Sequence, residues 1–144
     1  MKLENDYRIY ELRDPIDWGP KFWTFLYLLA LGLPTSLESQ QQTEFVRLIK
    51  TFYLFLPCIE CRYHYYHLVR DKEIQITTRQ EAFDMILELH NNVRKRMNKA
   101  TRMQEEVISW LYKQKRLNIF GKYSYLIIPI LCAIVITVIC LRKK

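Results

Sequence analysis

The chain has 144 residues, half of them hydrophobic and only three of them glycine, which allows one modest domain with an apolar core and excludes a disordered chain. Four cysteines are too few for a disulfide scaffold, and the polar, acid-bearing segment 1–6 is unlike a secretory signal peptide. The net charge is +7, but three cations lie at 142–144 behind an apolar tail, and the mild excess elsewhere argues against nucleic-acid binding.

The first two elements are predicted to be helices. Asp14 and Pro15 are helix-start signals, and the helix is expected to run through Trp18–Leu33 and to close before the next proline. Thr35 and Glu38 have the spacing of a capping box for a second helix. The apolar stripe of this second helix contains Phe45, Leu48, Ile49, Phe52 and Leu56.

Two further helices follow a proline at position 57. The third is expected to begin at about Cys58 and to end near Asp71. Thr77 and Gln80 mark the start of the fourth. One side of this fourth helix carries Phe83, Ile86, Leu87 and His90.

A short fifth helix is predicted to open at Thr101 with Gln104, and it carries Val107, Ile108 and Leu111 on one side. No segment shows the sustained period-two alternation of a strand. Short connections between amphipathic helices are typical of antiparallel bundles. The sequence therefore predicts an all-α fold, an antiparallel four-helix bundle with a short fifth helix.

The segment 125–141 contains no charged residue and is bracketed by Lys122 and by the basic residues 142–144. A bilayer span needs about 17–25 apolar residues, so this segment is near the short end of that range. The alternative is a buried core helix, but the segment is apolar all round. We expect a C-terminal transmembrane helix that makes the chain a single-pass membrane protein, with Cys132 and Cys140 inside the span. Basic residues on both sides leave its orientation open.

The strongest chemical motif is the CxxC formed by Cys58 and Cys61, because these are the only cysteines outside the apolar tail. Two thiols at this spacing can close a disulfide, and a helix start lowers the pKa of a thiol. Three alternatives stay open beside a redox disulfide. The first is a zinc site that one of His64 and His67 could join, and the second is a pair of buried free thiols. The third, a thioredoxin-like motif, would need a preceding strand, whereas residues 52–56 continue a helical stripe.

Two further groups of residues are compatible with nucleotide binding. His90 and Asn91 are followed one turn later by Arg94, so that a ring, an amide and a cation lie close together on the fourth helix. The first helix carries aromatic residues at Trp18–Trp23 and again at Tyr27. Each group has an ordinary alternative, a solvated helix end for the first and a packed core for the second.

In their order and separation, these motifs resemble the Erv/ALR family of FAD-linked sulfhydryl oxidases. That family has a tryptophan-bearing first helix, a CxxC after a proline at the start of the third helix, and an H-N-x-V-N segment on the fourth. The corresponding segments here are 18–23, 57–61 and 89–94, and the resemblance covers residues 14–115. The compact form is similar to the versions encoded by large DNA viruses.

The resemblance implies a homodimeric thiol oxidase that forms protein disulfides. Cys58 would exchange with substrate thiols, Cys61 would lie nearest the flavin, and FAD would pass the electrons to O2 to give hydrogen peroxide. Trp23 and His90 would frame the adenine, and Lys99 would meet phosphate. The positions at which the family contacts FAD are Gly19, Lys21, Trp23, Tyr27, His64, His90, Asn91, Val93, Arg94, Lys99 and Trp110.

Several positions depart from the family pattern. Tyr27 stands where the family has a histidine, and Arg94 stands where it has a second asparagine. Pro20 replaces a common arginine, for which Lys21 can substitute. The disulfide that pins the fifth helix is absent, because Leu87 occupies one cysteine position. No shuttle CxxC lies upstream, so a dithiol protein substrate or a thioredoxin-like donor must deliver the electrons.

A rival function is a non-catalytic, tail-anchored helical adaptor, or a zinc-binding protein that uses the CxxC without turnover. For the oxidase we expect no metal and no nucleic acid, and a location in a host membrane or a virion membrane. The predicted organisation is an N-terminal extension at 1–13, the oxidase domain at 14–115, a basic linker at 116–124, the transmembrane helix at 125–141 and a basic tail at 142–144.

Overall fold

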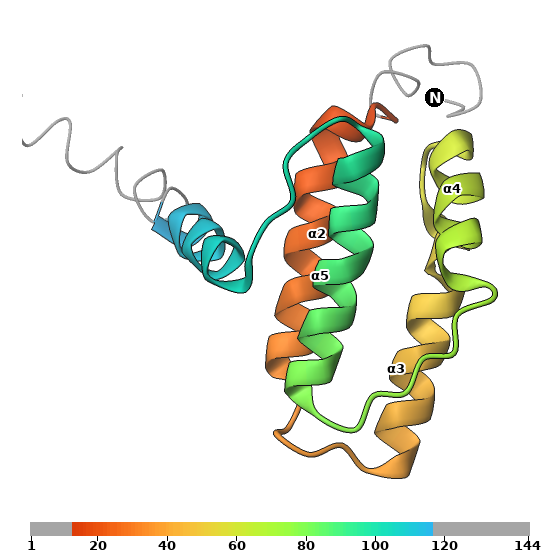
Figure 1. Cartoon of the computed structure of the whole chain (residues 1–144), viewed down its shortest axis with the longest axis vertical. Helices are drawn as coiled ribbons and strands as arrows, with labels where there is room; N and C mark the ends of the chain where they lie inside the picture. Colours follow the sequence, from red (N-terminus) through yellow and green to blue (C-terminus); the bar gives the residue numbers. More distant parts are fainter. Residues whose placement is uncertain (1–12, 117–144) are drawn as a thin grey trace, which may run out of the picture. The chain divides into compact units, whose positions relative to one another are not determined.

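The computed structural model of the chain describes residues 13–116 (Figure 1). It divides into two compact units, Met1–Arg102 and Met103–Lys144, which are described separately. Among the described residues no helix is long and apolar enough to cross a membrane. The predicted transmembrane helix at 125–141, most of the linker and the two terminal segments lie outside the described residues, so these predictions stay predictions.

The first unit is all-α over its described residues. Its elements are α2 (Pro15–Gly32), α3 (Ser39–Thr51), the short 3-10 helix η2 (Phe52–Phe55), α4 (Ile59–Val69) and α5 (Arg79–Arg96). Figure 1 shows α2 and α5 side by side and running in opposite directions. The starts of α2 and α4 and the end of α5 lie at the same end of the unit, and this end carries the CxxC.

One part of the core of the first unit lies between α2 and α5, and α3, α4 and the connecting segments bury further apolar side chains. The ring of Tyr27 on α2 packs against Phe83 on α5 with a centroid separation of 5.1 Å. Both helices turn an apolar face toward this interface at intervals of three and four residues. The buried members of the two faces are Trp23, Leu26, Tyr27, Ala30, Ala82, Phe83, Ile86, Leu89 and His90.

The helix starts confirm one sequence signal and correct two others. The side chain of Asp14 caps α2 as expected, since it accepts a 2.8 Å hydrogen bond from the amide of Ile16. The capping box of α3 is Glu38 with Gln41, not Thr35 with Glu38. The box of α5 is Thr78 with Glu81, not Thr77 with Gln80.

Pairing of the two loops explains why both of these helices start later than predicted. Ser36 and Thr78 form an isolated antiparallel bridge. The amide of Leu37 donates to the Thr77 carbonyl at 2.8 Å, and the amide of Arg79 donates to the Thr35 carbonyl at 3.3 Å. Thr35 and Thr77 use their backbone carbonyls in this extended pairing, and the helices begin after it. Thr78 is the last paired residue and, with its extended backbone, also the N-cap of α5.

Two predicted apolar stripes also differ from the structure. The 3-10 helix η2 follows Thr51 directly, so Phe52 and Leu56 do not continue the stripe of α3. On α5 the predicted stripe included Leu87, which is only half-buried, and the leucine that is buried instead is Leu89. In the second unit the helical residues begin at 104, so Thr101 does not open that helix. Instead the carboxylate of Glu106 accepts a 2.9 Å hydrogen bond from the amide of Met103.

Candidate redox and cofactor site

The CxxC lies at the start of α4 and forms a disulfide between Cys58 and Cys61, with their Cα atoms 5.1 Å apart. Cys58 is the N-cap residue, and its Sγ accepts a 3.2 Å hydrogen bond from the amide of Cys61. The positive end of a helix dipole stabilises a thiolate, so either sulfur is a good leaving group here. The predicted redox pair is therefore formed. Over residues 13–116, no group of three or more His, Cys, Asp or Glu side chains gathers as a metal site.

Arg62 fixes the backbone that leads into this disulfide. Its Nε donates a 2.5 Å hydrogen bond to the carbonyl of Leu56, across the intervening Pro57. Its amide donates at 3.0 Å to the carbonyl of Cys58. Because both bonds connect α4 to the residues before it, the Cys58 side chain keeps a defined direction.

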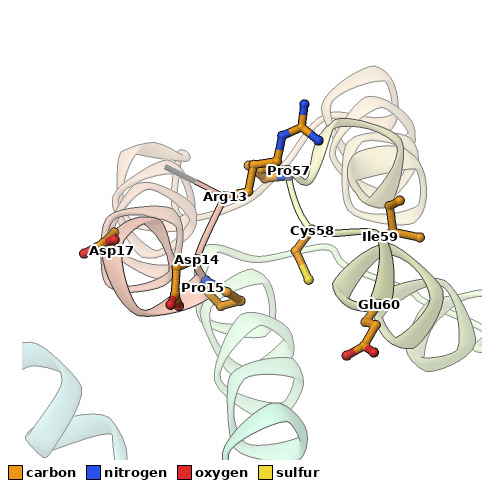
Figure 2. Close-up of a pocket in the computed structure, with 8 residues that line it drawn as sticks. All are labelled: Arg13, Asp14, Pro15, Asp17, Pro57, Cys58, Ile59 and Glu60. Carbon is orange, nitrogen blue, oxygen red and sulfur yellow. The ribbon is translucent and has the colours of Figure 1, made fainter. Parts of the chain in front are cut away.

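A pocket of about 710 Å³ opens beside Cys58, between the start of α2 and the start of α4. Figure 2 shows the sulfur of Cys58 between these two segments. Cys61 is absent from the lining, so the pocket gives access to one sulfur of the pair. The lining residues are Arg13, Asp14, Pro15, Asp17, Pro57, Cys58, Ile59 and Glu60.

Trp23, Tyr27 and His90 form a buried group between α2 and α5. The rings of Trp23 and His90 stack with a centroid separation of 4.4 Å and an interplanar angle of 12°. The hydroxyl of Tyr27 lies 3.0 Å from Nδ1 of His90. Since the two stacked rings already touch, an adenine could not lie between them, and it would have to meet an outer face or an edge of the stack.

Burial keeps this group uncharged. It lowers the pKa of His90 to about 3, and the charges of Arg102 and Arg94 act in the same direction. Burial also raises the pKa of the Tyr27 hydroxyl. A neutral imidazole can accept a hydrogen bond at Nδ1, so the phenol of Tyr27 is the natural donor and Nε2 keeps the ring proton. Tyr27, which replaces the family's histidine, thus orients His90.

The Asn91 amide holds a loop, although the sequence suggested that it meets a nucleotide. Its Nδ2 donates to the Arg102 carbonyl at 2.9 Å, and its Oδ1 accepts from the Arg102 amide at 2.8 Å. The Nε of Arg94 donates to the carbonyl of Ala100 at 2.6 Å. Both side chains of α5 therefore support the segment that follows the helix.

The end of α5 explains how Lys99 is presented. Asn98 has a φ of 55°, a left-handed conformation that asparagine tolerates at a helix end. The amide of Lys99 then bonds to the Arg94 carbonyl at 2.9 Å. The chain leaves α5 in a sharp turn, with Lys99 exposed. Val93 accepts a further bond from the amide of Met97 at 3.1 Å.

The remaining predicted site residues differ in their surroundings. At Gly19 an added Cβ would meet no atom within 4 Å, and Lys21 is exposed on the same helix. His64 on α4 is half-buried, and its pKa is lowered by desolvation and then by the charge of Arg96. Trp110 belongs to the second unit and is not placed relative to the others.

The sequence reasoning missed an aromatic cluster between α2 and α4. Phe22 lies 5.1 Å from Trp23 and 5.1 Å from Phe52, measured between ring centroids. It also lies 6.3 Å from Tyr65, which is 3% exposed. The available signal was the spacing of Tyr65, four residues after Cys61, which places both on one face of a helix.

A disulfide at a helix start, open to a pocket through one sulfur and accompanied by a buried aromatic–imidazole stack, defines an all-α thiol–disulfide oxidoreductase. The sequence profile of the Erv1/Alr family matches residues 20–115. The chain belongs to the Erv1/Alr family.

Individual relatives agree with this assignment. The FAD-linked sulfhydryl oxidase of African swine fever virus is 30% identical over 118 residues, which cover 77% of this chain and 94% of that protein. The mitochondrial FAD-linked sulfhydryl oxidase ERV1 of Saccharomyces cerevisiae is 30% identical over 95 residues, covering 64% of this chain and 50% of that protein. The crystal structure of the yeast Erv1 core matches with a TM-score of 0.59 and 27% identity, covering 62% of this chain and 75% of that chain.

Proposed function

We propose that this chain is an FAD-linked sulfhydryl oxidase that makes protein disulfides, with O2 as the final electron acceptor. The observation that carries the proposal is the Cys58–Cys61 disulfide at the start of α4 in a chain of the Erv1/Alr family. The dithiol substrate is a protein, or a thioredoxin-like donor that relays electrons from one.

The thiol chemistry follows from the access to Cys58. A substrate thiolate attacks Cys58 Sγ in the pocket, forms a mixed disulfide and releases Cys61 as a thiolate. The second thiolate of the substrate then attacks the substrate sulfur of this mixed disulfide. This attack closes the substrate disulfide and releases Cys58 as a thiolate. The substrate loses two electrons and two protons, and the electrons reside in the reduced CxxC. When bound, FAD would supply the acceptor for these two electrons and their route to O2, with hydrogen peroxide as the product.

The described residues fit FAD. The stack of Trp23 and His90 offers an aromatic edge to an adenine, and the open space at Gly19 allows close approach of a ligand to α2. Lys21 and Lys99 are exposed cations suited to a pyrophosphate. We propose that α2, α3, α4 and α5 form an antiparallel bundle that holds the flavin near Cys61, while Asn91, Val93 and Arg94 support the loop at its edge.

An absorption spectrum of the purified full-length chain in detergent tests this function. We expect a flavin band that dithiothreitol bleaches under nitrogen and that air restores, because the CxxC connects thiols to the flavin. One hydrogen peroxide should accumulate for each disulfide formed, that is, for every two thiols oxidised. A folded but colourless protein would contradict the oxidase and favour the adaptor function.

We propose that the chain forms a homodimer through an exposed apolar stripe on α2. Phe25, Leu28 and Leu31 share one face of that helix and are 49%, 55% and 37% exposed. The ring of Phe25 lies 6.4 Å from that of Phe52, which follows the last turn of α3, where Leu48 is also exposed. Such a contiguous apolar surface favours self-association.

The substitution Leu28→Glu should convert the dimer into a monomer, because it would bury a charge in an apolar interface. Sedimentation equilibrium of the full-length chain measures the change in mass. Tyr63→Glu is the matched control, since Tyr63 is 62% exposed on α4 and lies outside this surface. If Leu28→Glu and the unaltered chain have the same mass, the stripe is not the interface.

We also propose that the chain is anchored in a host or virion membrane by residues 125–141, on the basis of their uncharged sequence. Extraction of membranes with alkaline carbonate distinguishes an integral anchor from surface binding. Full-length chain should remain in the membrane pellet, and its appearance in the supernatant would refute the anchor.

A further inference from the structure

The hydroxyl of Tyr65 is a buried polar group without a hydrogen-bond partner among the residues that the structure describes. The Tyr65 side chain is 3% exposed, so water does not reach the hydroxyl from the surface. Folded proteins rarely leave such a group unpaired, because an unmet buried donor costs free energy. A bound ligand is one of the few ways to satisfy it.

The location of Tyr65 indicates which ligand this is. Tyr65 follows Cys61 by one turn of α4, so the two side chains lie on the same face. Its ring packs edge-on against Phe22 of α2, which in turn contacts Trp23. The Tyr65 ring therefore links the face of α4 that carries Cys61 to Phe22, the neighbour of Trp23 in the Trp23–His90 stack.

We propose that the Tyr65 hydroxyl donates a hydrogen bond to the isoalloxazine ring of bound FAD. This inference rests on the proposed function and adds a flavin-binding residue to it. The flavin ring carries carbonyl oxygens and ring nitrogens that can accept such a bond, and its polar edge gains negative charge when the ring is reduced. A donor at that edge stabilises the reduced ring more than the oxidised ring. Burial raises the pKa of Tyr65, which keeps the phenol protonated and able to donate.

The substitution Tyr65→Phe removes the hydroxyl and keeps the ring, so the packing on Phe22 is preserved. In the FAD-loaded full-length chain we expect FAD release to become about ten-fold faster, the size of one lost hydrogen bond. The midpoint potential of the bound flavin should become more negative. Tyr63→Phe is the matched control on the same helix, because Tyr63 is 62% exposed, and it should change neither quantity.

The flavin potential decides the result. An unchanged potential in Tyr65→Phe overturns the proposal whatever the release rate, because a hydroxyl that only fills space, or that binds a water, leaves the flavin's redox balance as it was. A shift of equal size in Tyr63→Phe overturns it as well. Failure of the oxidase function itself has a separate signature, since the unaltered chain would then contain no flavin.

Discussion

Replacing Cys61 by serine should abolish thiol-driven oxygen consumption while the protein stays yellow. Serine keeps the size of the side chain at the third position of α4, but it cannot form the disulfide with Cys58. Electrons from the substrate then have no route to the flavin. Loss of a group that acts in the covalent step lowers turnover by a factor of about a thousand or more. An oxygen electrode, with dithiothreitol and with a reduced protein dithiol as substrates, measures the effect.

The tail cysteines supply the matched control for this experiment. Cys132→Ser with Cys140→Ser removes two thiols from the chain and leaves the CxxC intact. This double variant should keep full turnover. Flavin content must be equal in all variants, so that the rates are compared per bound FAD. Normal turnover in Cys61→Ser would refute electron transfer through the Cys58–Cys61 pair.

Local signals predicted the helices well where nothing else competed for the residues. Asp14 and Pro15 begin α2 as expected, and the Asp14 side chain caps the helix. Thr35 and Thr77 have equally good capping spacing, yet both lie in the loop pairing around Ser36 and Thr78. That pairing joins residues about forty positions apart, so it cannot be read from either local pattern.

In the candidate site, too, some features follow from the local sequence and others depend on distant residues. The position of the CxxC follows from Pro57 and the flanking apolar segments, and the structure places Cys58 at the start of α4. The roles of Asn91 and Tyr65 depend on what faces them. Asn91 bonds to the backbone of Arg102, and the Tyr65 hydroxyl has no partner among the described residues. Residue type alone does not distinguish a ligand contact from a loop support.

The stability of the protein should fall between pH 6.5 and pH 5 because of His90. This side chain is 7% exposed, and burial lowers its pKa from 6.5 to about 3, assisted by Arg102 and Arg94. In that pH range the unfolded chain binds a proton at His90 that the folded chain does not bind. The stabilisation is therefore complete above pH 6.5 and is lost as the pH falls toward 3. Linkage gives a loss of about 2 kcal/mol by pH 5.

Urea unfolding of the full-length chain at several pH values between 7 and 5 measures this loss. In His90→Gln the glutamine cannot titrate, and its amide can still accept a hydrogen bond from Tyr27. Between pH 7 and pH 5, the free energy of unfolding of this variant should therefore fall by about 2 kcal/mol less than that of the unaltered chain. His67→Gln is the matched control, because it makes the same substitution at an exposed histidine of α4. An equal slope in the unaltered chain and in His90→Gln would mean that folded His90 binds its proton as readily as the unfolded chain does, and so is mostly protonated at pH 5. The buried stack with Trp23 would then carry a positive charge, and the Tyr27 hydroxyl would accept a hydrogen bond from Nδ1 and not donate one.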